Sequence, residues 1–310
     1  MQHFDAQAVA TALPYAQLVD ALATGLQAPI EVPVRSVLSP NHDESCVLVM
    51  PAWKSGQRMG IKLVSVWPGN SALGLPAVSG VYVLMSCETG QPLAVMDGTE
   101  LTLRRTAAAA ALAARTLARQ DSRTLAVLGT GALSAPLVQA HCSVMPFERV
   151  LVWGRGAQRA EAVVGQLQAQ GQSAEVAVDL QQTLAQADVV AVATTATQPF
   201  IAADWVRPGT HVGLVGAFTP KMAEAEPALM ARAQLFADQR AAVIEKGGEV
   251  WQALEQALIK PDAIEAELAD LAAKPLRTWR RSAQGITVFK SVGFAALDLI
   301  AAEQVYQGRA

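Results

Sequence analysis

Two glycines at a strand-to-helix junction are the residues of this sequence that most directly indicate chemistry. The apolar run at 125–128 ends at Gly129 and Gly131, and an Ala/Leu/Val pattern typical of a helix continues to about residue 144. In such a turn the first glycine takes angles closed to other residues, the second lets the main chain approach a pyrophosphate, and the helix N-terminus supplies N–H groups. Ser134, or Ala135 one place on, stands where the dinucleotide pattern has a third glycine. The residues expected to bind a dinucleotide here are Gly129, Gly131, Ala132 and Leu133.

The pattern around this turn decides between a dinucleotide site and an ordinary βα loop, which the two glycines alone would also fit. After residue 122, near-continuous apolar runs alternate with amphipathic helical segments. This alternation predicts a parallel sheet covered on both faces, in a doubly wound α/β domain of the Rossmann type whose first βα connection is the glycine turn. The further strands are expected at residues 149–153, 174–178, 188–193, 210–215 and 234–237.

The end of the second strand bears on which nicotinamide cofactor binds. In NAD-binding folds an acidic residue there accepts hydrogen bonds from the adenosine ribose, but residues 151–159 include none. Arg155 and Arg159 can instead pair with the 2′-phosphate of NADP, so NADP(H) is favoured, with NAD(H) as the alternative. The alternative is that both are solvated arginines at a helix start. Thr194 and Thr195 follow the strand at 188–193 and are expected to face the cofactor, although threonines also form turns.

Composition limits the class of partner. The chain has 310 residues, enough for two domains, with a net charge of −3 and 16% charged residues. A chain with this charge lacks the excess of basic residues that binds a nucleic-acid backbone, so a small metabolite is the expected partner. The sequence shows no apolar run long enough to span a membrane and no signal-peptide pattern, and its three widely spaced cysteines form neither a disulfide framework nor a zinc site. A cytoplasmic protein is expected.

The first third of the chain predicts a second, β-rich domain. Two short helices are expected within residues 5–28, separated at Pro14. Runs rich in Val, Leu, Ile and Met then indicate hairpins and meanders rather than βαβ units, and a helix over 99–119 follows. These runs lie at 32–38, 46–50, 60–66, 78–85 and 93–96. After about Lys260 the chain is expected to be helical until a strand, a turn and a last helix within 285–300, which we expect to return to the first domain.

Five strings, in order along nearly the whole chain, resemble those of the ornithine cyclodeaminase/μ-crystallin family. They are MGIKLVSVWPGN at 59–70, TGQPLA at 89–94, LRRTAA at 103–108, the Gly129 turn, and TVFKSVG at 287–293. The resemblance implies a homodimer in which a β-rich substrate-binding and dimerisation domain, residues 1–115 with 287–310, packs against a Rossmann NAD(P)-binding domain, residues 116–286. Known members are ornithine cyclodeaminases, alanine dehydrogenases, cyclic ketimine reductases and NADPH-binding crystallins.

The same resemblance implies a substrate site. Arg35, Lys62 and Arg105 match the residues that bind the substrate carboxylate in the family. Their chemistry agrees, because a guanidinium pairs with a carboxylate through two bonds and an ammonium adds a point charge. Lys62 is also the candidate catalytic residue, as a proton relay. Ser291 and Val292 match the family's loop under the nicotinamide.

One departure from the family pattern bears on the reaction. Cyclodeaminases of the family have an aspartate where this chain has Phe218, although Glu224 or Glu226 could substitute. The string Gly-Ala-Phe-Thr-Pro resembles the Δ1-pyrroline-2-carboxylate/Δ1-piperideine-2-carboxylate reductase branch. The expected function is therefore NAD(P)H-dependent reduction of small cyclic imino acids to L-proline or L-pipecolate. Ornithine cyclodeaminase and alanine dehydrogenase activity stay open, as does an NADPH-binding, crystallin-like protein without turnover.

Overall fold

Two compact units make up the protein. The computed structural model describes residues 1–41, 45–276 and 278–308; unit 1 consists of Met1–Thr106 with Phe294–Ala310, and unit 2 of Ala107–Gly293. The sequence predicts the divisions at 115/116 and 286/287. The strand Ile286–Lys290 instead lies in the sheet of unit 2, because it pairs there with a strand on each side, and the chain re-enters unit 1 at Phe294.

Unit 1 is built on a six-stranded sheet. Its strands are β1 Gln2–Phe4, β2 Ser36–Leu38, β3 Cys46–Lys54, β4 Arg58–Val66, β5 Val78–Ser86 and β6 Pro92–Asp97. They lie in the order β1-β6-β5-β4-β3-β2, with β2 to β6 antiparallel and β1 parallel to β6. The predicted meander is therefore present. The three-residue β1 was not predicted, because it is too short to show an alternating pattern.

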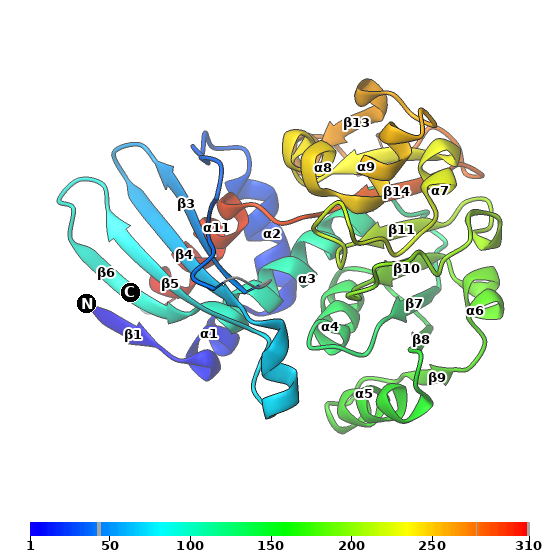
Figure 1. Cartoon of the computed structure of the whole chain (residues 1–310), viewed down its shortest axis with the longest axis horizontal. Helices are drawn as coiled ribbons and strands as arrows, with labels where there is room; N and C mark the ends of the chain where they lie inside the picture. Colours follow the sequence, from blue (N-terminus) through cyan, green and yellow to red (C-terminus); the bar gives the residue numbers. More distant parts are fainter. Residues whose placement is uncertain (42–44, 277, 309–310) are drawn as a thin grey trace. The chain divides into compact units, whose positions relative to one another are not determined.

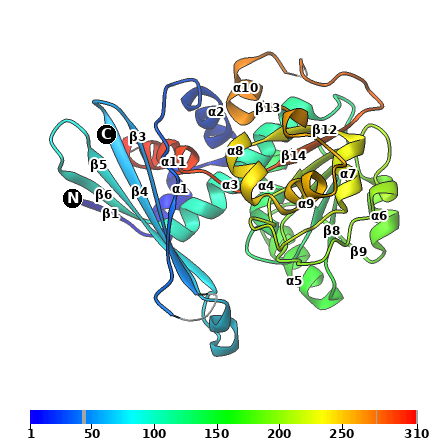
Figure 2. The ribbon, with the colours of Figure 1, turned by 45° about the horizontal axis from the view of Figure 1, so that its top comes forward.

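Helices cover one face of this sheet, and the other face is partly exposed. Helices α1 Ala6–Ala12, α2 Tyr15–Gly25 and α11 Ala295–Gln307 belong to unit 1, and α11 lies along β3, β4 and β5 (Figure 2). Alternate residues of β4 are buried on one face, among them Lys62 and Val64. The residues between them, such as Ile61 and the 37% exposed Leu63, point to the other face, which is therefore apolar and only partly covered.

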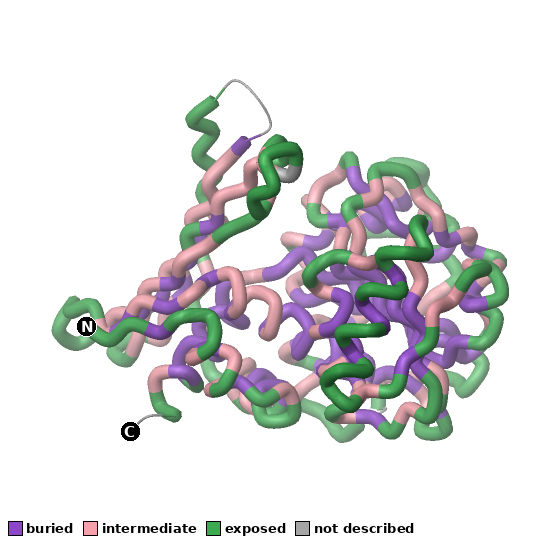
Figure 3. The backbone as a smooth tube through the Cα atoms, turned by 90° about the horizontal axis from the view of Figure 1, so that it is seen from below, coloured by how far each residue is buried: buried purple, intermediate pink, exposed green. Residues whose placement is uncertain are grey.

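Unit 2 contains a wholly parallel sheet of eight strands. These are β7 Thr124–Leu128, β8 Arg149–Trp153, β9 Glu175–Ala177, β10 Val189–Val192, β11 His211–Leu214, β12 Ala233–Ala237, β13 Ile264–Glu267 and β14 Ile286–Lys290. Their order is β13-β12-β14-β11-β10-β7-β8-β9, and buried residues fill the centre of the unit (Figure 3). Successive connections leave β7 and β10 in opposite directions, so the switch point where doubly wound folds bind ligands lies at the carboxyl ends of these two strands.

Helices flank the parallel strands of unit 2 on both sides (Figure 1). They are α4 Ser134–Val144, α5 Ala157–Ala169, α6 Leu180–Gln186, α7 Pro227–Arg232, α8 Arg240–Lys246, α9 Gly248–Glu255 and α10 Leu268–Ala273. Helix α3 Gly98–Leu117 begins in unit 1 and continues into unit 2. The 3-10 turns are η1 Pro68–Leu73 in unit 1, and η2 Ala203–Trp205 and η3 Pro261–Ala263 in unit 2. The prediction of an all-helical segment after Lys260 is wrong, because the four-residue β13 pairs with β12 there. Among the described residues, no helix is long and apolar enough to cross a membrane.

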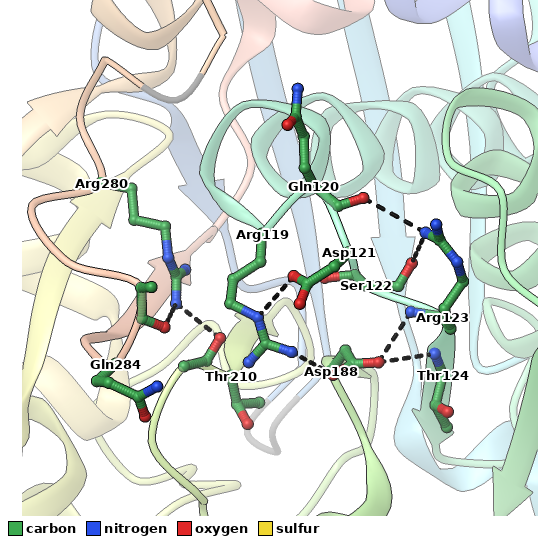
Figure 4. A network of polar contacts seen from close by, with 12 residues as sticks. Arg119, Gln120, Asp121, Ser122, Arg123, Thr124, Asp188, Thr210, Arg280 and Gln284 are labelled. Carbon is green, nitrogen blue, oxygen red and sulfur yellow. Dashed lines mark hydrogen bonds and ion pairs between the residues drawn. The ribbon is translucent and has the colours of Figure 1, made fainter.

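A carboxylate joins the amino ends of the parallel strands. Asp188, immediately before β10, accepts bonds from the backbone N–H groups of Arg123 and Thr124 and from the guanidinium group of Arg119 (Figure 4). The guanidinium group of Arg207 bonds the same carboxylate. A hollow of about 600 Å³ lies beside this network. The arginines around it are already engaged by the carboxylates of Asp188, Asp121 and Glu265 and by backbone carbonyls, so we assign the network a structural role.

Candidate active site

The glycine turn leaves space next to its backbone. Gly129 has φ 128°, and a Cβ there would come within 2.4 Å of the Ala193 carbonyl oxygen, so β7 and the end of β10 approach closely. A Cβ on Gly131 would meet no atom within 4 Å. Ser134, which replaces the third glycine, is buried, and its Oγ donates to the Gly129 carbonyl oxygen at 2.8 Å. The turn therefore suits a pyrophosphate lying against the main chain at Gly131.

Most of the other residues assigned to the cofactor are accessible at the carboxyl edge of this sheet. Ala132 is exposed and Leu133 is half-buried at the start of α4. Arg155 and Arg159 are both exposed, one just before α5 and one in its first turn. Thr195 is exposed after β10. Each is free to contact a ligand without a rearrangement of the core.

Thr194 is held in place by a buried carboxylate. Glu224 accepts bonds from the Thr194 N–H at 2.6 Å and its Oγ1 at 3.0 Å, and from the N–H groups of Gly216 at 2.9 Å and Ala217 at 3.3 Å. Glu224 thus ties the loops after β10 and β11 together inside the core, where it is fully buried. Glu226 accepts a bond from the backbone of η2 and likewise has a structural partner.

Two more buried charges adjoin Glu224. The Oε1 atom of Glu249 accepts a bond from the Glu224 N–H at 2.7 Å, and its Oε2 lies 2.7 Å from the Nζ of Lys290. Both side chains of this ion pair are at most 1% exposed. Burial raises the pKa of Glu224 above its usual value; Lys290 opposes this rise and Glu249 adds to it. Lys290 is therefore the cation that allows two carboxylates to be buried side by side.

Another acid holds the loop assigned to the nicotinamide. Asp238 follows β12, and its Oδ2 accepts bonds from the Ser291 Oγ at 2.7 Å, the Val292 N–H at 3.0 Å and the Gly293 N–H at 2.6 Å. Ser291 therefore uses its hydroxyl to fix the loop. Asp238 was not predicted, although an acid directly after an apolar strand was the available signal.

Lys62 and Arg105 meet within unit 1. Lys62 on β4 and Arg105 on α3 are 1% and 5% exposed, and both bond the same atom, Oδ1 of Asp298 on α11, at 2.8 Å. The Lys62 Nζ also donates to the Thr102 Oγ1 at 3.3 Å. Asp298 is fully buried and was not predicted; an acid inside the apolar run of the last helix was the available signal. The structure thus brings two predicted cations together on a carboxylate of their own chain.

The Lys62 environment lowers the proton affinity of its amine. Burial and the neighbouring Arg105, and to a smaller extent Arg35, lower the pKa of Lys62 to about 8, against the opposing effect of Asp298. Arg35 itself lies half-buried just before β2. A lysine with this pKa can both hold a charge and exchange a proton near neutral pH.

Phe218, which the resemblance matches to the cyclodeaminase aspartate, lies beyond the end of β11 and is 36% exposed. Its ring can neither accept a proton nor bond an ammonium group. Unit 2 therefore has open space at the glycine turn and no acid at position 218, and unit 1 has a buried pair of cations.

Comparison with known proteins identifies the family. The family model described as "Ornithine cyclodeaminase/mu-crystallin family" matches residues 5–309. The chain belongs to this family. The Delta(1)-pyrroline-2-carboxylate reductase of Paracoccus denitrificans is 39% identical, over 94% of this chain and 92% of the relative. The resemblance inferred from the five sequence strings is confirmed.

Solved structures of similar proteins agree in fold with this chain. The Delta(1)-pyrroline-2-carboxylate reductase of Thermococcus litoralis, solved with NADH and L-proline, has a TM-score of 0.94 and 27% identity, over 99% of this chain and 97% of that chain. An archaeal alanine dehydrogenase dimer with bound NAD has a TM-score of 0.91 and 28% identity, over 99% and 95%. The predicted Rossmann domain with a second, β-rich domain is confirmed.

Proposed function

We propose that this chain is an NAD(P)H-dependent reductase of small cyclic imino acids, which converts Δ1-pyrroline-2-carboxylate to L-proline or Δ1-piperideine-2-carboxylate to L-pipecolate. The observation that carries the proposal is the pair of buried cations, Lys62 and Arg105, in a chain that is 39% identical to a reductase of the first of these substrates. Both proposed substrates have a carboxylate next to the carbon of a C=N bond. Cations that bind this carboxylate therefore fix the position of the reacting carbon.

The reaction adds a hydride to the imine carbon and a proton to the imine nitrogen. A nicotinamide cofactor supplies the hydride when it is bound. Arg35, Lys62 and Arg105 bind the substrate carboxylate in this proposal, and Lys62 is the candidate for exchanging the proton. The open space at Gly131 and the loop fixed by Asp238 support cofactor binding in unit 2. The remaining proposed cofactor contacts are the residues assigned from the sequence, Gly129, Ala132, Leu133, Thr194, Thr195, Ser291 and Val292.

NADP(H) is the proposed preferred cofactor, with Arg155 and Arg159 as ligands of the 2′-phosphate. Both are exposed at the start of α5, which follows the second strand of the Rossmann order, and residues 154–159 include no acid. Arg155→Asp should shift the ratio of kcat/KM for NADPH over NADH towards NADH by at least about tenfold, because it removes a charge-assisted bond and adds repulsion. Arg123→Asp, at the opposite edge of the sheet, is the control. An unchanged ratio in Arg155→Asp would remove Arg155 from the cofactor site.

The assay that tests the function mixes purified protein, NADPH or NADH, and each of the two cyclic imino acids. Loss of nicotinamide absorbance with formation of L-proline or L-pipecolate supports the reductase. Release of ammonia from L-ornithine with NAD would indicate a cyclodeaminase, and NAD reduction with L-alanine an alanine dehydrogenase. Cofactor binding with none of these reactions would indicate a crystallin-like binding protein.

We also propose a homodimer formed through the outer face of the unit 1 sheet. This face presents partly exposed apolar residues on adjacent strands, including Ile61, Leu63, Val81 and Val83. Burying such a face against a second copy removes apolar area from water. Leu63→Lys should shift the sedimentation coefficient towards that of a monomer, whereas Leu258→Lys, at an exposed site of unit 2, should not.

A further inference from the structure

The ion cluster of unit 1 consists of Lys62, Arg105 and Asp298. Its central residue, Asp298, is not among the residues predicted to bind the substrate. Asp298 receives the Lys62 Nζ and the Arg105 Nε on a single oxygen, Oδ1, with both distances 2.8 Å. Its side chain is fully buried, between the buried side chains of Lys62 and Arg105. One oxygen that bonds both cations sets their separation and their relative orientation.

The N–H donors of Lys62 and Arg105 that do not bond Asp298 determine which ligand these two cations can still bind. An ammonium has three N–H donors, of which Lys62 directs one to Asp298 and one to Thr102. A guanidinium has five, and among the described residues no acceptor bonds the terminal Nη atoms of Arg105. The formal charge of Lys62, Arg105 and Asp298 together is +1. The cluster can therefore accept one more carboxylate, which makes its charge zero.

We propose that Asp298 is a positioning residue of the imino acid site, which holds Lys62 and Arg105 side by side so that their remaining N–H donors converge on the carboxylate of the substrate. The inference rests on the proposed function. Asp298 does not touch the substrate itself; it acts through the two cations.

Asp298 also keeps Lys62 charged. The charged and titratable groups around the Lys62 amine are Arg105 from α3, Asp298 from α11, Arg35 ahead of β2 and, on the neighbouring strand, Tyr82, with the ion pair of Lys54 and Glu303 nearby. Arg105 and Arg35 oppose the positive charge, as does burial, while Asp298 favours it. Burial, Asp298 and Glu303 raise the pKa of the Tyr82 hydroxyl, which therefore stays neutral. Lys62 depends on Asp298 for its protonated form.

The test replaces Asp298 by a neutral residue and measures the pH profile of kcat/KM for the imino acid. In Asp298→Asn the side-chain shape is kept and the charge is lost, so Lys62 gives up its proton at lower pH. The alkaline fall of the profile should move down by about 1 to 3 pH units. Glu303→Gln is the matched control, because Glu303 lies on the same helix and bonds the Lys54 Nζ at 2.5 Å. Its profile should stay that of the wild type.

Two further measurements separate the possible outcomes. Lys62→Arg keeps the positive charge but cannot exchange a proton near neutral pH, so its residual activity should be low and should show no alkaline fall, which would assign the fall to Lys62. Asp298→Ser, which is smaller and leaves room for a water molecule, replaces the asparagine variant if that variant does not fold. A folded Asp298 variant whose profile coincides with the wild type overturns the inference. Absence of imino acid reduction by the wild type would instead refute the proposed function. In that case a double-mutant cycle between positions 62 and 298, measured as unfolding free energy, would still report whether the charges of Lys62 and Asp298 are coupled.

Discussion

Loss of Lys290 should destabilise the protein far more than loss of another lysine in an ion pair. Lys290→Met removes the cation that lies 2.7 Å from the Glu249 Oε2, in an ion pair whose two side chains are at most 1% exposed. Two buried carboxylates, Glu249 and Glu224, are then left next to each other, since the Glu249 Oε1 bonds the backbone N–H of Glu224. Breaking a buried pair from one side costs about 3–5 kcal/mol of unfolding free energy, a large part of the roughly 5–15 kcal/mol of a typical domain.

The pH dependence of this loss has a definite sign. Burial already raises the pKa of Glu224 above the unfolded value of 4.5, and Lys290 restrains that rise. Without Lys290 the folded form binds a proton more tightly than the unfolded form, so the stability deficit should grow as pH rises through the folded pKa and shrink as pH falls towards 4.5. Urea unfolding of Lys290→Met at pH 8 and pH 5.5 should show a smaller deficit at the lower pH.

The control for this experiment lies in the same unit. Lys246 pairs with Glu245 at 3.4 Å, but Glu245 is 63% exposed, so Lys246→Met should cost under about 1 kcal/mol at both pH values. Equal losses for the two methionine variants, or a Lys290→Met deficit that does not change with pH, would show that the buried charges of unit 2 are not coupled as described.

Three further predictions use positions where the structure gives a clear contrast. Gly131→Ala should leave the unfolding free energy within about 0.5 kcal/mol of the wild type. It should weaken NAD(P)H binding, monitored by fluorescence, at least about tenfold, because the added Cβ enters the space assigned to the pyrophosphate. Gly165→Ala, whose Cβ likewise meets no atom within 4 Å, is the control and should change binding little. Gly60→Ala should lower the melting temperature, since its Cβ would come 1.7 Å from the Tyr82 hydroxyl, whereas Gly69→Ala meets no atom within 4 Å. Burial lowers the pKa of His141 to about 4 and, with a smaller effect of nearby cations, that of His211 to about 3. Both histidines stay neutral when folded, so stability should fall as pH drops below 6.5, by about 2 kcal/mol per histidine at pH 5, and His141→Gln should reduce that loss in denaturant titrations.

Local chemistry allowed much of the fold to be predicted from the sequence. The glycine turn and the helix after it depend on neighbouring residues, and α4 ends at Val144 as the apolar pattern indicated. The parallel strands of unit 2 were visible because strands buried on both faces are continuous apolar runs. The short β13 was not visible, because four residues at the edge of a sheet produce no periodic signal that outweighs the helical pattern around them.

The charged sites required the tertiary structure. Lys62 and Arg105 could be assigned as cations from the sequence, but their shared partner Asp298 lies 236 positions beyond Lys62, and only the packing of α11 on β4 brings the three together. Glu224, Glu249 and Lys290 likewise come from separate segments of unit 2. A sequence determines which side chains can be charged, but burial and long-range contacts determine which of them must be paired, because an unpaired charge in the core costs several kcal/mol.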